Sequence, residues 1–268
     1  MVTPKKSMNA AESNGTQELN DPKLAALIQV INGSTQQLAD QVEQLTPEQL
    51  RQQAYPTEWT VADVLSHLGS GATIMRRRLD DEVVDMQAIW DDWNAKDPDS
   101  QAADSLLADD LLNDRLYALT AEDQDTMRFA MGPAELDLLT FLDLRLNEHA
   151  LHTWDVVVTF DATATVPDNR AALIVDTLPL IARFAGKPTG VDRDISIRTV
   201  VPSRTFALAL RPDSVTLSPA DPVDQPDLVL PAEALIRLVY GRLDPDHTPR
   251  GIVGVGHLDE LRQVFPGF

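Results

Sequence analysis

The feature that most constrains the fold is a change in hydrophobic periodicity close to residue 186. Before it, apolar residues recur every three or four positions, the spacing of helices with one buried face. From Asp194 onward, apolar and polar residues alternate, which is typical of half-buried strands. Glycines and a proline separate the two regions. We therefore expect an α+β multidomain protein, with a helical domain over residues 21–188 and a smaller α/β domain over 189–268.

The helical region contains five periodic segments. They predict helices over about 24–45, 60–78, 102–119, 135–160 and 170–185, the last bent at Pro179. Thr60 and Asp63 form an acidic variant of the capping box at the start of the second helix. Residues 80–114 are strongly acidic, and we expect there a loop and a short helix.

The C-terminal region is predicted to contain short strands and two helices. The strands are expected near 194–201, 206–210, 215–217, 227–230 and 252–255, and the helices near 232–240 and 258–264. Its glycines at 251, 254 and 256 do not lie between a strand and a helix, so a nucleotide-binding loop is not indicated.

The charge of the chain excludes some partners. It carries 42 acidic and 22 basic residues, for a formal net charge of −20, which repels phosphate backbones and anionic membranes. We expect neither a nucleic acid nor a membrane as partner. No apolar run approaches the roughly 20 residues needed to cross a bilayer. Residues 1–20 are polar and lack the apolar core of a secretory signal, so they predict a disordered tail and a cytoplasmic protein.

The sequence contains no cysteine. Disulfides, cysteine-ligated metals and a catalytic cysteine are therefore excluded. Any thiol used in a reaction must come from a cofactor or a substrate.

One helix carries a candidate metal site. Glu148 and His152 are separated by four residues, which places them about 40° apart on one helical face, whereas His149 points elsewhere. His67, within the capped helix, is the candidate for a third ligand. Two histidines and a glutamate leave open positions, as catalytic zinc sites require. An ion pair on a helix surface and a hydrogen-bonded core histidine are the alternatives that this spacing leaves open.

Two segments resemble motifs of a known enzyme family. Residues 59–68 read WTVADVLSHL and resemble the W-T-x-x-D-x-x-x-H-L signature in the second helix of DinB-like four-helix bundles. Residues 145–155 contain R-x2-E-x3-H-x2-D and resemble the matching third-helix motif of the mycothiol-dependent maleylpyruvate isomerase family. Residues 238–242 and 265–268, which read LVYGR and FPGF, are similar to the second, sterol-carrier-like α/β domain of that family. The resemblance runs in order from residue 21 to 268.

The resemblance implies a ligand set and two cofactors. His67, Glu148 and His152 would hold zinc, or another divalent ion such as Ni²⁺, and mycothiol would bring its thiol to the metal. The family's polar residues near the site correspond to Asp155 and Arg242, which the resemblance implies as catalytic residues.

The sequence leaves two roles open for Arg242. It could hold a carboxylate of the thiol or substrate bidentately across the domain cleft, or form an ordinary salt bridge with Asp244 or Asp246.

The resemblance further implies an actinobacterial enzyme that activates the thiolate of mycothiol for attack on a small electrophilic substrate. An isomerase would add the thiolate to a cis double bond, allow rotation and expel it, whereas an S-transferase would keep the new bond. The chain is expected to be a monomer or a homodimer. Two alternatives stay open: a non-catalytic small-molecule-binding protein with a structural metal, and a hydrolase that uses zinc-bound water.

Overall fold

The computed structural model describes residues 19–55, 58–132 and 134–267. Almost all of the predicted tail, residues 1–20, lies outside these ranges. No helix among the described residues combines the length and the apolar character that crossing a membrane would require.

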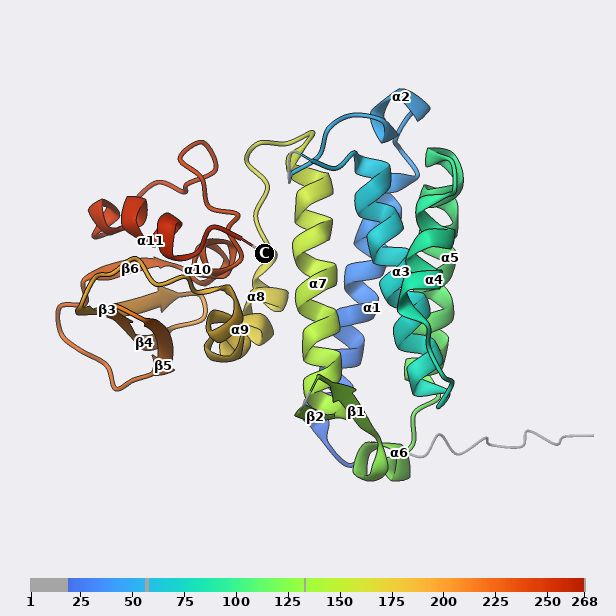
Figure 1. The fold of residues 1–268 in the computed structure, drawn as a ribbon, viewed down its shortest axis with the longest axis horizontal. Helices are drawn as coiled ribbons and strands as arrows, with labels where there is room; N and C mark the ends of the chain where they lie inside the picture. The colour runs from blue at the N-terminus through green and yellow to red at the C-terminus, as the bar shows by residue number, and fades with distance from the viewer. Residues whose placement is uncertain (1–18, 56–57, 133, 268) are drawn as a thin grey trace, which may run out of the picture.

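Four long helices lie side by side and form the N-terminal bundle (Figure 1): α1 Pro22–Val42, α3 Val61–Leu79, α5 Pro98–Tyr117 and α7 Leu138–Val158. Each begins after a side chain that accepts a hydrogen bond from the first turn, namely that of Asp21, Thr60, Asp97 or Asp137. Shorter elements connect them: α2 Pro47–Leu50, α4 Met86–Asn94, α6 Ala121–Thr126, β1 Arg128–Met131 and β2 Ala134–Asp137. The predicted helical N-terminal region is confirmed.

Two predictions for this region were wrong in detail. The long helix begins at Leu138 rather than at 135, because residues 134–137 pair with β1 in an antiparallel hairpin and Asp137 caps the helix. In the acidic segment 80–114, α4 is the expected short helix, but the helix expected over 102–119 begins four residues earlier, at Pro98, as α5, which packs along α3.

The C-terminal region is built on a four-stranded sheet in the order β5-β4-β3-β6. Its strands are β3 Arg193–Val200, β4 Arg204–Arg211, β5 Ser214–Pro219 and β6 Leu228–Pro231. The first three form antiparallel neighbours, and β6 joins β3 in parallel after a crossover. Its helices are α10 Ala232–Val239, η2 Val255–His257 and α11 Leu258–Val264. The α+β fold class is therefore confirmed, whereas the predicted strand at 252–255 is only a single bridge between Val253 and Val229.

Three short helices connect the bundle to the sheet: α8 Asp168–Ile174, η1 Val175–Thr177 and α9 Leu178–Ala185. The helix predicted over 170–185 is thus interrupted just before Pro179, which cannot donate the hydrogen bond that a continuous helix needs.

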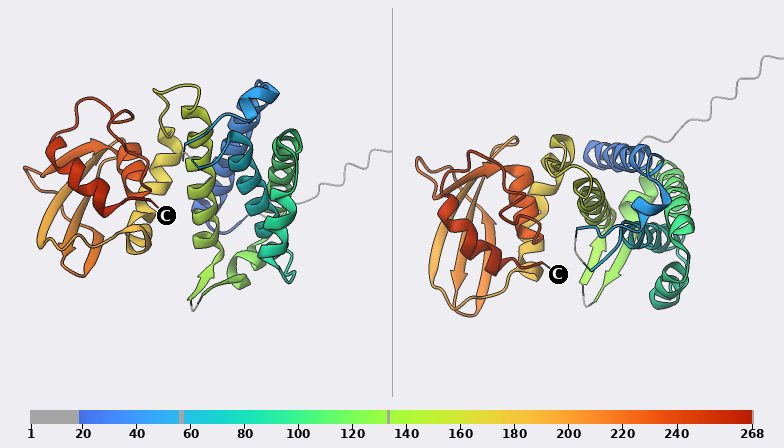
Figure 2. Two further views of the ribbon diagram at one scale, coloured as in Figure 1. Left: turned by 45° about the horizontal axis from the view of Figure 1, so that its top comes forward. Right: turned by 90° about the horizontal axis from the view of Figure 1, so that it is seen from above.

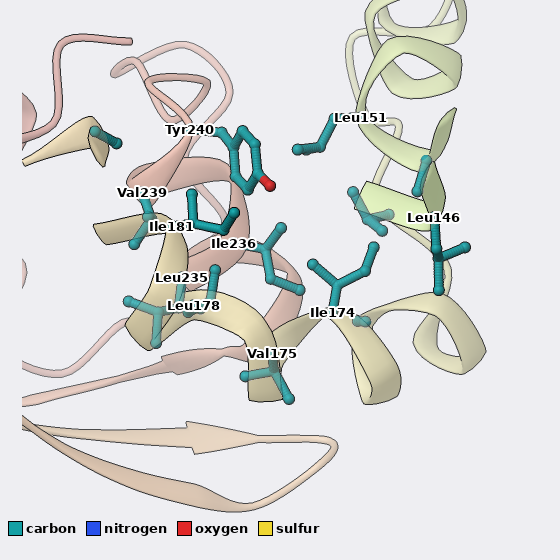
Figure 3. Close-up of a cluster of buried hydrophobic side chains, with 14 of the residues drawn as sticks. Leu146, Leu151, Ile174, Val175, Leu178, Ile181, Leu235, Ile236, Val239 and Tyr240 are labelled. Carbon is teal, nitrogen blue, oxygen red and sulfur yellow. The ribbon is translucent and has the colours of Figure 1, made fainter. Parts of the chain in front are cut away.

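These connecting helices lie between the two parts of the molecule in each view (Figures 1 and 2). α8 contacts α1 and α7 on one side and α10 on the other, and α9 packs against β5 and α10. Figure 3 shows the apolar side chains that fill this junction, from Leu146 and Leu151 of α7 through Ile174 and Leu178 to Ile236 and Tyr240. The predicted domain boundary at residue 188 stays a prediction. The packing of α8 and α9 against α10 and β5 favours a domain boundary earlier in the chain, before α8.

Candidate metal site

The structure brings His67, Glu148 and His152 together. One donor atom from each side chain lies within 4.8 Å of the other two. The Glu148 Oε2 atom is 3.3 Å from His67 Nε2 and 3.5 Å from His152 Nε2. The His67 and Glu148 side chains are 38% and 49% exposed, so an incoming ligand can reach the cluster.

Local sequence sets the position of these groups. Thr60 and Asp63 form the predicted capping box, which fixes the start of α3 two turns before His67. Glu148 and His152 lie one turn apart on α7, as their spacing predicts. The sequence could not show that α3 and α7 touch, and the structure shows that they do.

Asp155 and Arg242 continue the site away from the cluster. The Nδ1 atom of His152 is 2.8 Å from Asp155 Oδ2, and Arg242 donates from Nε and Nη2 to the two carboxylate oxygens of Asp155, at 2.8 Å each. Arg242 also donates to the Tyr240 carbonyl. Its guanidinium is therefore bound within the protein, to Asp155 rather than to Asp244 or Asp246.

Hydrogen bonds keep the Glu148 carboxyl ionised. Desolvation of the covered half of its side chain disfavours ionised Glu148, but hydrogen bonds with His152 and His67 outweigh this effect and hold the pKa of its carboxyl far below the usual range. Burial lowers the pKa of His152, yet its hydrogen bonds with Asp155 and Glu148 raise the pKa above its usual value. The net effect is an anionic group between two imidazoles, where a cation is favoured.

A cavity of about 410 Å³ opens onto the cluster from the side of the second domain. Its wall combines Trp59 and Tyr55 from the bundle with Tyr240 and Arg242 from the α10 end. The Trp59 ring lies 5.2 Å from the His67 ring, centroid to centroid. Gly241, at φ +71°, ends α10 and touches Gly267, so only glycine fits there.

A second charged cluster lies inside the bundle and was not predicted. Buried Asp109 of α5 accepts from Arg145 and His149 of α7, and the other ring nitrogen of His149 lies 2.8 Å from the Ser34 hydroxyl of α1. His149 thus points away from Glu148, as expected. Asp109 could not be distinguished from its many acidic neighbours in the sequence, because only the packing of α5 buries it.

The three donors fit a divalent ion. Two imidazole nitrogens and one carboxylate oxygen are ligands that zinc and nickel both accept. Ligating histidines usually donate their second ring N–H to a carboxylate, and Asp155 occupies that position for His152. Among the described residues the cluster has three members, which leaves room for an exogenous ligand.

Fold and site together define a helical bundle with a candidate divalent-metal site, joined to an α+β domain that contributes to the wall of its cavity. The family model described as the mycothiol maleylpyruvate isomerase N-terminal domain matches residues 32–157, so this part of the chain is similar to that domain. The match includes His67, Glu148, His152 and Asp155 but ends before Arg242.

Two solved structures share the fold of the whole chain. One is a crystal structure of the mycothiol-dependent maleylpyruvate isomerase, and the other is a histidine-to-alanine mutant of it. Each aligns with 82% of this chain and 89% of its own, at a TM-score of 0.59 and 15% identity. At that identity the likeness shows the common two-part fold. A search of curated proteins found no match.

Proposed function

We propose that this protein is a metal-dependent enzyme that activates the thiolate of mycothiol for attack on a small electrophilic substrate, as an isomerase or an S-transferase. The observation that carries the proposal is the cluster of His67, Glu148 and His152 at an open cavity. A divalent ion bound there, zinc or a similar metal, lowers the pKa of a thiol and so supplies a nucleophile at neutral pH.

The protein's own groups prepare this site. His67 and His152 offer Nε2 atoms and Glu148 offers a carboxylate oxygen. Asp155 accepts the Nδ1 proton of His152, which leaves the Nε2 lone pair directed at the cluster. Arg242 holds Asp155 in place, so we assign both residues as positioning groups for the reaction.

The cavity suits a polar thiol cofactor. Tyr55, Glu58 and Arg242 provide polar groups beside Trp59, and the missing cysteines require that the nucleophilic sulfur comes from outside the chain. Three ligands favour catalysis over a purely structural metal, which would be expected to have four.

Thiol dependence tests this proposal. The full-length chain, either loaded with zinc or metal-free, is incubated with monochlorobimane or with maleylpyruvate, each with and without mycothiol. Turnover of either compound only in the presence of both zinc and mycothiol is the expected result, and the reacting compound separates transferase from isomerase. Turnover without any thiol would overturn the proposal and favour a hydrolase.

A further inference from the structure

A second cavity, of about 260 Å³, also opens onto the metal cluster. It shares His67 and Glu148 with the first cavity but extends toward the N-terminal end of α7, away from Arg242. Nothing in the proposed thiol site uses this space. A reaction between a thiol and a second molecule needs two approaches to one reacting centre.

Helical spacing gives this cavity an elongated shape. Its α3 wall contains His67, Gly71 and Arg78, which lie at i, i+4 and i+11 and span about 16 Å along the helix. On α7, Glu148 and Phe141 lie two turns apart on the facing side. Gly71 keeps the middle open, because an added Cβ there would meet only Arg145 Nη1, at 3.2 Å.

The lining is mainly apolar. Between the two ends, apart from Gly71 and from Arg145, which is paired with Asp109, it consists of Ile74, Met75, Met86, Trp90, Leu136 and Leu144, together with Ala130 and Phe141. Met86 and Trp90 of α4 are each 39% exposed. Such uncovered apolar surface favours a ligand that is itself apolar along most of its length.

Arg78 places a positive charge at the end of the cavity remote from the cluster. Its neighbours Arg76 and Arg77 form ion pairs with Asp80 and Glu82. Arg78 itself donates from Nη2 to the Met86 sulfur, at 3.5 Å, and forms no ion pair within the part of the chain that the structure describes. In a chain with a net charge of −20, an arginine left without a carboxylate can bind an anionic group of a ligand.

We propose that this second cavity binds the electrophilic substrate, and that the substrate is an amphipathic carboxylate. Its carboxylate pairs with Arg78, its ring or medium-length chain covers the apolar wall, and its reacting carbon lies beside His67 and Glu148. The inference rests on the proposed function, which supplies the thiolate from the first cavity. A small dianion such as maleylpyruvate would leave most of the apolar wall uncovered, so the preferred substrate is more apolar than that.

Binding of a non-reactive probe tests the inference without metal or thiol. The probe is 4-phenylbutyrate, its neutral analogue is 4-phenyl-1-butanol, and both are titrated calorimetrically into the full-length metal-free chain. Arg78→Gln should weaken phenylbutyrate binding about tenfold and leave the alcohol unaffected, because it removes one charge-assisted contact. Arg77→Gln, whose arginine pairs with Glu82 outside the cavity, is the matched control and should bind like the unaltered chain.

Two further variants test the location. Gly71→Leu fills the middle of the cavity and should abolish binding of both probes. Met86→Glu changes a half-exposed residue at the rim of the cavity, so it should disturb folding less than Gly71→Leu. It should weaken the binding of phenylbutyrate but not that of the alcohol. Equal phenylbutyrate affinity in the Arg78→Gln and Arg77→Gln variants, or undiminished binding in folded Gly71→Leu, would overturn the inference. Because no metal or thiol is present, these failures are distinguishable from a failure of thiol-dependent turnover.

Discussion

At the scale of single residues, Asp155 connects the two functional halves of the site. Its side chain is fully buried and contacts His152 on its own helix and Arg242 from 87 positions later in the chain. A buried carboxylate is tolerated only when such partners satisfy it. The spacing of Glu148, His152 and Asp155 was visible in the sequence, whereas the pairing with Arg242 depends on how the domains meet.

Asp155→Asn should weaken zinc binding by roughly 10- to 100-fold, the usual effect of losing a partner that orients a ligating histidine. The amide can no longer accept equally from His152 and Arg242. Zinc affinity is measured by competition with a chromogenic chelator. Asp244→Asn, which alters a carboxylate paired with His247, is the control and should retain affinity. Unchanged affinity in Asp155→Asn would show that His152 needs no such partner.

His152→Ala should abolish stoichiometric zinc binding, because two remaining donors cannot hold the ion in competition with water. Metal content after dialysis is measured by elemental analysis. His257→Ala removes an imidazole in the second domain that lies beside Arg193, and it should leave the zinc content intact. Zinc retained at one equivalent by His152→Ala contradicts the ligand assignment.

At the scale of elements, α5 explains why the bundle was only partly predictable. It buries Gln101, Ser105 and Asp109 at helical spacing, while Leu107 and Leu111 are exposed. Apolar periodicity therefore misplaces its buried face. α3 approaches these small polar residues closely: a Cβ at Gly69 would lie 2.9 Å from the Cα of Ser105. The helix α3 was found because its cap and its apolar face agree, and α7 was found from its long apolar periodicity alone.

The buried cluster that joins α1, α5 and α7 predicts a dependence of stability on pH. Burial lowers the pKa of His149 below the ordinary histidine value of about 6.5, so the ring is neutral beside the Asp109–Arg145 pair. The contribution of neutral His149 to the free energy of unfolding is complete above pH 6.5. It is lost as the pH falls from there toward the lower pKa of His149 in the folded state. The free energy of unfolding, measured in urea, should decrease by at most about 1.4 kcal/mol per pH unit in this window.

His149→Gln removes the titrating group but keeps a donor for Asp109, so it should flatten this part of the pH profile. His257→Gln, at a half-buried position in the second domain, should leave the profile unchanged. A profile equally steep in His149→Gln and in the unaltered chain would assign the pH dependence to other groups.

At the scale of the whole molecule, the domain junction has an apolar and a charged part. The apolar part consists of α8 and α9 packed between α7 and α10 (Figure 3). The charged part is the bidentate pair of Asp155 and Arg242. Periodicity predicted both domains and most of their elements, but a junction between them has no local signal. The sequence alone therefore left Arg242 to bind either a ligand or an acidic neighbour in its own loop.

The pair with Asp155 changes what we expect of Arg242→Ala. From the sequence alone, this change should raise the apparent KM for thiol or substrate and leave the metal in place. With the arginine removed, however, Asp155 stays buried with only His152 as partner, and breaking such a pair costs on the order of 3–5 kcal/mol. We therefore expect lower unfolding stability and weaker zinc affinity together. Arg262→Ala, which loses contacts within the second domain only, should lower stability without changing zinc affinity. A raised KM with full zinc affinity in Arg242→Ala would instead show that Arg242 binds the ligand and that Asp155 orients His152 unaided.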